Sequence, residues 1–309
     1  MPITWGRGDV VMNVGDLVVR KSYGGDIAFR VEDLRSNLAV IKGTEFRLLA
    51  DSPLDDLVKV PYAPLSERSQ KANIKANESL NRLKRHRDEM TERNQADLGG
   101  SWPMMEQPSY FEVPGKVLHL DGDLNYLKKS LSLYQQLRVP AEGHYVNETG
   151  MADALYRLLP RVRPDIVVIT GHDGVLKHRP NNDLYSLNSY KNSQNFVSAI
   201  QVARQYERHY DTLTIVAGAC QSHFEALLQA GANFASSPGR ILIHALDPVY
   251  VAAKASFTSV RDTINMMDVL HNTISGTQGV GGIETRGSYR IGLPRLNDLS
   301  QLKVTPSVM

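Results

Sequence analysis

The sequence predicts an α/β protein whose mainly parallel sheet is covered by helices on both faces, preceded by a small β unit. From Lys116 onward, short apolar runs of strand length alternate with amphipathic segments of helical length. Before residue 62, short runs rich in valine, isoleucine and phenylalanine are separated by turn residues. Of the 309 residues, 42% are apolar and 22% are charged, which is typical of a folded chain. We therefore divide the chain into residues 1–62, 63–115 and 116–309.

The first region is expected to form a small barrel of the SH3 type. The runs DLVVRKSY, DIAFRVEDL, LAVIKG and EFRLLA are separated by Gly24-Gly25, Ser36-Asn37 and Gly43-Thr44, which favour turns. Its basic residues are few, so we interpret it as a packing or docking module and do not expect it to bind nucleic acid.

The second region is strongly charged, with sparse apolar residues at helical spacing. It predicts an exposed helix or helical hairpin up to about residue 98, followed by an irregular linker rich in glycine and proline. A charged helix is usually a solvated surface, and we assign it no chemistry.

The third region supplies the α/β pattern. Buried strands are expected at 116–120, 141–146, 165–170, 212–218, 233–237 and 240–246, with a final strand within 283–293. Helices are expected at 124–137, 151–159, 195–208, 223–230, 249–257 and 264–274. The glycine-rich stretch 276–282 is expected to be a loop, and it lacks the lysine of a nucleotide-binding P-loop.

Bulk properties limit the classes of function. The formal net charge of +2 gives no argument for nucleic acid or a membrane surface as a partner. No apolar run reaches the roughly 20 residues that span a bilayer, and the N-terminus does not resemble a secretory signal. The chain has one cysteine, so a reducing, cytoplasmic compartment is the simpler expectation.

Two expected strands end in loops that carry reactive groups. Strand 165–170 leads into Gly171-His172-Asp173-Gly174, and strand 212–218 leads into Ala219-Cys220-Gln221. Because the carboxyl ends of parallel strands meet at one edge of a sheet, a thiol and its base are expected to face each other there. Most single cysteines are buried structural residues, but the paired histidine loop favours a nucleophile, Cys220, and a general base, His172.

The surroundings of Cys220 suit that chemistry. A helix is expected to begin at this residue, which would favour the thiolate and lower the pKa of the thiol. Backbone N–H groups near Cys220 and at Asp173 or Gly174 are candidates for an oxyanion hole, with Gln221 beside the cleft. No metal-ligand spacing links His172, Asp173 or the other histidines, so no metal and no cofactor is expected. His119 and His144 lie in expected strands and are interpreted as structural.

Several stretches resemble one family closely. DLVVRKSYGGDIAFRVEDL, HLDGDLNYL, RPDIVVITGHDG, AGACQSHFEALLQAGANFASSP and RILIHALDPV are similar to the YabG family of sporulation-specific peptidases, and they cover most of residues 15–255. The chain order of the histidine and cysteine strands is similar to that of the caspase, gingipain and clostripain clan. The resemblance implies a caspase-like sheet, His172 as base and Cys220 as nucleophile. It also implies spore coat proteins as substrates, in the mother cell or on the coat. Asp173 stands between His172 and Gly174, where the wider clan has glycine directly after the histidine.

Two acids follow the first strand of the sheet. Asp121 and Asp123 are placed where members of the resembled clan carry the charge that selects the P1 side chain, so we predict cleavage after arginine and, more weakly, lysine. Asp123 is also a candidate N-cap of the next helix. Self-cleavage is expected in the exposed segment 66–115, which offers the bonds after Arg68, Arg82, Arg85, Arg87 and Arg93.

Two other functions remain open. In a glutamine-amidotransferase-like hydrolase, His244 would replace His172 as the base of Cys220, although the second glycine of such a nucleophile elbow is missing. In a non-catalytic scaffold, the β unit would dock onto coat or nucleic acid, and Cys220 would be inert toward thiol reagents.

Overall fold

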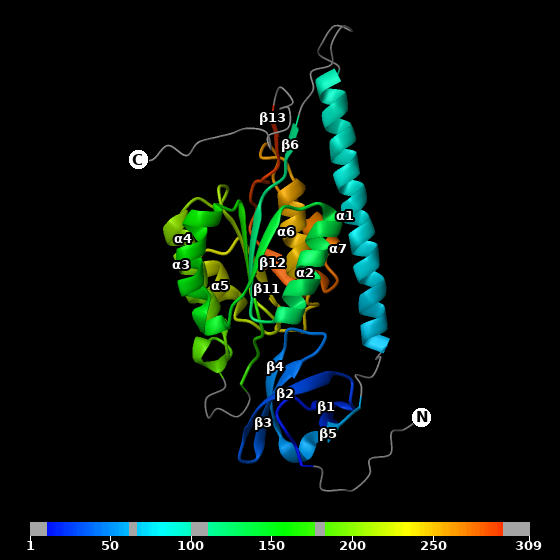
Figure 1. The fold of residues 1–309 in the computed structure, drawn as a ribbon, viewed down its shortest axis with the longest axis vertical. Coiled ribbons are helices and arrows are strands. Elements are labelled where there is room, and N and C mark those ends of the chain that lie inside the picture. The colour runs from blue at the N-terminus through cyan, green and yellow to red at the C-terminus, as the bar shows by residue number, and fades with distance from the viewer. Residues whose placement is uncertain (1–10, 62–66, 100–110, 177–182, 293–309) are drawn as a thin grey trace, which may run out of the picture.

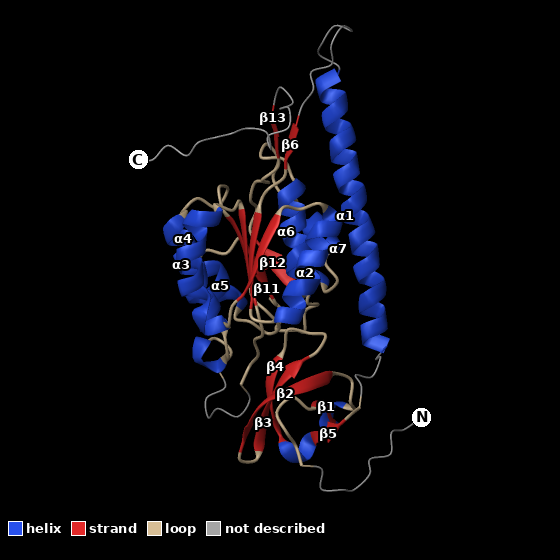
Figure 2. Cartoon of the chain, viewed as in Figure 1, coloured by secondary structure: helices blue, strands red, loops and turns tan. Residues whose placement is uncertain are grey.

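A computed structural model describes residues 11–61, 67–99, 111–176 and 183–292. Within these ranges, a small antiparallel sheet adjoins a larger, mostly parallel sheet that has helices on both faces (Figures 1 and 2). The α/β class predicted from the sequence is confirmed. No helix among the described residues combines the length and apolarity needed to cross a bilayer.

The first region forms a five-stranded antiparallel sheet in the order β4-β3-β2-β1-β5. Its strands are β1 (Leu17–Arg20), β2 (Ala28–Arg35), β3 (Leu38–Gly43), β4 (Leu49–Pro53) and β5 (Leu57–Lys59), with single 3-10 turns at Lys21–Tyr23 and Leu54–Asp56. Alternate side chains of β1, β2 and β3 point into one apolar core, as the period of two requires. Its likeness to an SH3-type barrel stays a prediction.

The charged region is one long helix, α1 (Glu67–Gly99), rather than a hairpin. It runs along one side of the larger domain (Figure 1), and its Leu83 is buried against that domain. The predicted linker is only partly irregular, because β6 (Phe111–Val113) pairs with β13 (Arg290–Gly292) in a separate two-stranded sheet. Residues 100–110 of that linker lie outside the described residues.

The larger sheet has the order β12-β11-β10-β9-β7-β8. Its strands are β7 (Val117–Asp121), β8 (Ala141–Tyr145), β9 (Ile166–Thr170), β10 (Thr214–Ala217), β11 (Phe234–Ser236) and β12 (Val280–Gly282). Strands β7 to β11 are parallel to one another, and β12 is antiparallel to β11.

Two predicted elements differ from the structure. The glycine-rich stretch expected to be a loop contains β12, and a Cβ at Gly282 would stand 2.3 Å from the carbonyl oxygen of Asn233, so glycine permits this close pairing. Residues 240–246, expected to be a strand of the sheet, form only an isolated bridge between His244 and Phe46 of the β unit.

Helices cover both faces of the large sheet (Figure 2). One face is covered by α2 (Leu124–Leu137), α6 (Asp247–Phe257) and α7 (Met266–Asn272) together with α1, and the other by α3 (Met151–Val162), α4 (Ser193–Tyr206) and α5 (Phe224–Gln229). Single 3-10 turns lie at Glu148–Gly150, Leu187–Ser189 and Gly276–Gln278. In α3 the buried residues recur at helical spacing, at Met151, Ala154, Leu155, Leu158, Leu159 and Val162.

The β unit lies across the carboxyl edge of the large sheet. The segment between β3 and β4 makes the contact: Phe46 bridges His244, Leu48 bridges Asp173, and the Leu49 N–H donates to the Asp173 carbonyl oxygen at 2.8 Å. Reactive groups at this edge are therefore covered by a segment that precedes them by more than a hundred residues.

Candidate active site

The predicted histidine and cysteine loops leave neighbouring strands at the same edge of the large sheet. β9 ends at Thr170 and leads to His172, and β10 ends at Ala217 and leads to Cys220. β9 also pairs with β7, whose last residue is Asp121. The histidine loop is thus central, with the acid and the cysteine loop on either side of it.

Cys220 lies in a tight, fully buried turn. Gly218 has a φ of 111° and Gln221 a φ of 55°, so the chain adopts left-handed conformations on both sides of the cysteine. The Cys220 Sγ accepts the N–H of Ile243 at 3.3 Å. Burial raises the pKa of Cys220 to about 12, so the thiol is protonated in this conformation.

Two expectations about this cysteine are wrong. Helix α5 begins at Phe224, with His223 as its N-cap, so Cys220 does not stand at a helix N-terminus. The pKa of the thiol is accordingly raised rather than lowered, because no helix end is present to offset the cost of burying a thiolate.

His172 is also buried, with 1% of its surface exposed. Its ring stacks on Tyr126 at a centroid distance of 5.5 Å, and its Nε2 lies 3.9 Å from the Asp123 Oδ2. Within the part of the chain that the structure describes, neither ring nitrogen has a hydrogen-bond partner. Burial and the nearby charge of Lys42 lower the pKa of His172 to about 3, so the ring is neutral near pH 7.

A buried glutamate holds the histidine loop. Glu148 accepts the His172 backbone N–H at 2.8 Å through its Oε1. A Cβ built on Gly122 or Gly171 would stand 2.3 or 2.5 Å from that same oxygen, so these glycines make room for the carboxyl group. Burial raises the pKa of Glu148. This residue was not identified from the sequence.

Asp173 joins the two reactive loops. Its Oδ1 accepts the N–H of Asn192, and its Oδ2 accepts the hydroxyls of Ser193, which begins α4, and of Ser222 in the cysteine loop. Burial raises the pKa of Asp173 to about 6, against the lowering effect of these hydrogen bonds. The carboxyl group of Asp173 therefore links the histidine loop to the start of α4 and to the cysteine loop.

The backbone N–H groups that were candidate oxyanion donors fall into two kinds. The Gly174 N–H donates to the carboxylate of Asp173 at 2.9 Å, and the Gln221 N–H donates to Ser237 Oγ at 3.1 Å. The backbone N–H groups of Cys220 and Asp173 instead converge on one carbonyl oxygen, at 3.2 and 3.3 Å. That oxygen belongs to Arg47 of the β unit.

Arg47 and Asp121 form a fully buried ion pair. The guanidinium donates from Nη1 to Oδ1 and from Nη2 to Oδ2, both at 2.8 Å, and from Nε to the Ala245 carbonyl oxygen at 3.1 Å. Its Cζ also lies 4.9 Å from the centroid of the Tyr126 ring. Burial acts to raise the pKa of Asp121, but the Arg47 guanidinium outweighs it and holds that pKa well below the usual range.

Asp123, the second acid, has a different position. Its Oδ1 accepts the N–H groups of Asn125 and Tyr126, so it is the N-cap of α2, as predicted. Its Oδ2 lies 3.3 Å from Lys42 Nζ, in a part-exposed ion pair. Its carboxylate faces His172 and Lys42, whereas that of Asp121 faces Arg47.

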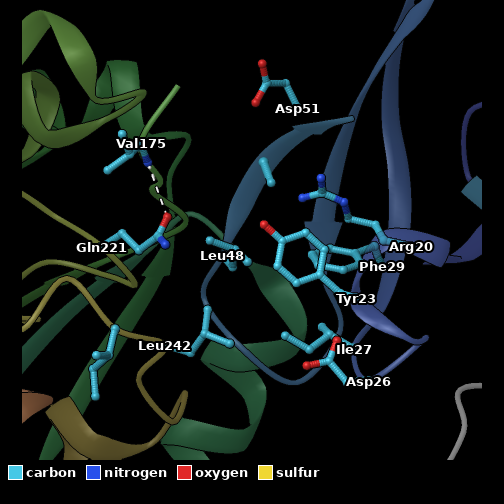
Figure 3. A pocket seen from close by; sticks show the side chains of 12 residues that line it. Arg20, Tyr23, Asp26, Ile27, Phe29, Leu48, Asp51, Val175, Gln221 and Leu242 are labelled. Atoms are coloured by element: carbon cyan, nitrogen blue, oxygen red, sulfur yellow. Dashed lines mark hydrogen bonds between the residues drawn. The ribbon is translucent and has the colours of Figure 1, made fainter. Parts of the chain in front are cut away.

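Cavities flank the segment that covers the site. One hollow, of about 350 Å³, is lined by residues that include Leu48, Val175 and Gln221 (Figure 3). Another, of about 520 Å³, is lined by residues that include Phe46 and His244, and it shares Ile241 and Leu242 with the first. Phe46 and Leu48, the two neighbours of Arg47, therefore each line a hollow.

His244, the alternative base, makes backbone contacts. Its Nδ1 accepts the Leu246 N–H at 3.2 Å, and its own N–H donates to Ser275 Oγ at 2.9 Å. Burial lowers the pKa of His244 to about 4. Among the described residues, no group of three acidic, histidine or cysteine side chains could hold a metal ion.

The two histidines that were predicted to be structural make side-chain hydrogen bonds within the fold. His119 contacts the Tyr134 hydroxyl at 3.2 Å and Thr170 Oγ1 at 2.8 Å, and His144 contacts Glu142. Arg47 itself was missed: its sequence signal is one cation inside the apolar run EFRLLA.

Comparisons with known proteins agree on one family. A family model described as YabG peptidase U57 matches residues 13–294. The sporulation-specific protease YabG of Bacillus subtilis (strain 168) is 46% identical over 286 residues, which cover 91% of this chain and 97% of that protein. No solved structure matches the chain.

Proposed function

The chain belongs to the YabG family of sporulation peptidases, and from this premise we propose that it is a cysteine endopeptidase in which Cys220 is the nucleophile and His172 the general base. One observation supports the proposal most. The N–H groups of Cys220 and Asp173 converge on a peptide carbonyl oxygen, at 3.2 and 3.3 Å, in the loops that carry the thiol and the imidazole. Two converging donors of this kind stabilise the oxyanion of acyl transfer.

The reaction would use the side chains and backbone N–H groups of the two loops. The neutral imidazole of His172 takes the thiol proton, and the Cys220 Sγ attacks the scissile carbonyl carbon. The N–H groups of Cys220 and Asp173 stabilise the oxyanion, and His172 returns the proton to the leaving amine. Water then hydrolyses the thioester. The His172–Cys220 dyad is not hydrogen-bonded in the present conformation, so the two side chains must come together before the thiol proton can be transferred, as is common for catalytic pairs.

The S1 pocket is assigned to Asp121. Its carboxylate holds a guanidinium through two hydrogen bonds of 2.8 Å, and the aromatic ring of Tyr126 lies beside the same group. A planar guanidinium matches this pair of oxygens better than an ammonium does, so the preferred P1 residue is arginine, with lysine weaker. Asp123 caps α2 and is the less suitable of the two acids for this role.

The biological setting follows from the relatives. The named relative is a sporulation-specific protease, and we infer spore coat proteins as substrates, processed in the mother cell or on the coat. The order of the histidine and cysteine strands supports a place in the caspase, gingipain and clostripain clan. No cofactor is needed for the chemistry.

The test is digestion of a denatured spore-coat extract by the purified chain. Cys220→Ala and His172→Ala should each lower the rate by at least about a thousandfold, the scale for removing a catalytic group. His244→Ala should keep most of the activity. An inactive His244→Ala protein beside an active His172→Ala protein would favour the amidotransferase-like alternative.

A further inference from the structure

The second half of the loop between β3 and β4, Phe46–Leu49, lies across the candidate active site and pairs with it through backbone bridges. On one side of Arg47, Phe46 forms an antiparallel bridge with His244. On the other side, Leu48 forms a parallel bridge with Asp173, and the Leu49 N–H donates to the Asp173 carbonyl oxygen at 2.8 Å. Backbone pairing along an extended peptide is how a cleft holds a polypeptide regardless of its sequence.

Arg47 occupies the position of a P1 residue in its side-chain and carbonyl contacts. Its guanidinium is paired with the carboxylate of Asp121, and its carbonyl oxygen accepts the N–H groups of Cys220 and Asp173. The thiol lies beside the same stretch of main chain, because Cys220 belongs to one apolar cluster with Phe46 and Leu48, the residues on either side of Arg47. The peptide bond that follows this carbonyl is Arg47–Leu48.

No other chain can reach the site in this conformation. The exposed fractions of Cys220, Asp121 and Arg47 are all 0%, and that of His172 is 1%. Given the proposed function, on which this inference rests, we propose that the chain is latent as synthesised and activates itself by cleaving its own Arg47–Leu48 bond.

The chemical step balances without a co-reactant other than water. The Cys220 Sγ forms a bond to the Arg47 carbonyl carbon, and the bond from that carbon to the Leu48 nitrogen breaks. The thiol proton passes through His172 to the Leu48 nitrogen, which leaves as an amine. Water then cleaves the thioester, which yields an Arg47 carboxylate and restores the thiol.

The connections around the bond explain how the cut opens the site. Before cleavage, the Gly43 N–H donates to the Leu48 carbonyl oxygen at 2.8 Å, which closes the segment into a tight loop. The cut breaks the covalent connection between β3 and β4, which stay paired as strands, so Arg47 becomes the end of a chain and can withdraw from Asp121. The two hollows beside Phe46 and Leu48 would then join into one cleft for an external substrate.

This site differs from the self-cleavage expected from the sequence. Arg68, Arg82, Arg85, Arg87 and Arg93 all lie within helix α1. A helical bond cannot pair with a cleft as an extended strand does, so these bonds must unwind before they can be cut. The Arg47–Leu48 bond is already held in place by backbone bridges at Phe46 and Leu48.

The experiment follows the new N-terminus over time. The purified full-length chain is incubated, and mass spectrometry measures the fragment that begins at Leu48, while an arginyl coumarin amide reports activity in the same sample. We expect coumarin release to show a lag and to rise in step with this fragment. Cys220→Ala should stay uncut. Arg47→Lys should slow the cut by about tenfold or more, because a charge-assisted hydrogen bond is lost, whereas Arg30→Gln, at an exposed arginine of β2, should match the wild type.

The contrary outcomes are distinct. A wild-type chain that stays uncut overturns the inference whether or not it is active, and so does equal cutting in the Cys220→Ala protein. Full coumarin release from the first moment, with Arg47–Leu48 intact, overturns latency and leaves the proposed function standing. The proposed function itself would fail if chains that already begin at Leu48 released no coumarin in a reaction that depends on Cys220.

Discussion

Replacement of Asp121 by asparagine tests the assignment of the S1 pocket. The carboxylate accepts two N–H groups of a guanidinium at 2.8 Å each, and its Oδ1 also accepts the Asp123 N–H at 2.9 Å. Asparagine keeps one acceptor oxygen, but it removes the negative charge and turns an N–H₂ group toward a donor. The loss of one partner of a buried, hydrogen-bonded charge pair removes about 2–4 kcal/mol of transition-state stabilisation. We therefore expect kcat/KM for arginyl substrates to fall roughly 30- to 1,000-fold.

The assay compares arginine with citrulline at P1. Citrulline has nearly the same shape as arginine but no charge, so the ratio of the two kcat/KM values reports the contribution of the carboxylate. Because both rates come from one sample, a smaller fraction of active protein cancels in the ratio. This matters because breaking a buried ion pair costs about 3–5 kcal/mol of folding stability.

Asp123→Asn is the matched control. This residue caps α2 and is part-exposed, so its replacement should cost a few tenths to about 1 kcal/mol of stability and change the arginine-to-citrulline ratio by less than about threefold. An unchanged ratio in Asp121→Asn, or a collapse of the ratio in Asp123→Asn alone, would refute the assignment of the pocket to Asp121.

Three further expectations concern the stability of the loop that carries His172 and the absence of a metal from the mechanism. Gly171→Ala should lower the free energy of unfolding by about 1–3 kcal/mol, because its Cβ would stand 2.5 Å from Glu148 Oε1, whereas Gly150→Ala, whose Cβ meets only a side chain at 3.6 Å, should be nearly neutral in urea denaturation. The pKa of Asp173 is raised to about 6 in the folded state, so the stabilisation of its protonated form is complete below its ordinary pKa and is lost as the pH rises through 6. The stability of the wild type relative to Asp173→Asn should therefore fall between pH 4 and pH 7, and an opposite slope in denaturation curves would contradict this. EDTA should leave arginyl hydrolysis unchanged, and a loss that a divalent ion restores would show that the metal-free mechanism is wrong.

The arrangement of the large sheet was predictable from local patterns. The buried run of β9 and the shorter run of β10 are continuous and apolar, and such strands pair in parallel beneath two layers of helices. Their neighbouring carboxyl ends place the loops of His172 and Cys220 at one edge, as expected.

The cover of the site was not predictable in this way. Arg47 meets Asp121 across 74 positions of sequence, and no local pattern specifies so distant a contact. The expected low pKa of Cys220 failed for the same reason: the burial that raises it comes from the β unit, which also contributes Phe46 and Leu48 to the cluster around the thiol. The β12 strand was missed because glycine carries no strand propensity, although the absence of a side chain is what admits Gly282 to the edge of the sheet.

Covalent labelling of the active chain tests the central claim most directly, which is that Cys220 is the nucleophile of an arginine-directed peptidase. An arginyl chloromethyl ketone is added to the wild-type chain while it hydrolyses an arginyl substrate, and peptide mapping locates the adduct. We expect stoichiometric alkylation of Cys220 in parallel with the loss of activity, protection by excess substrate, and no stoichiometric adduct on the Cys220→Ala protein. Undiminished hydrolysis by the Cys220→Ala protein, or complete inactivation of the wild type with Cys220 unmodified, would contradict the account.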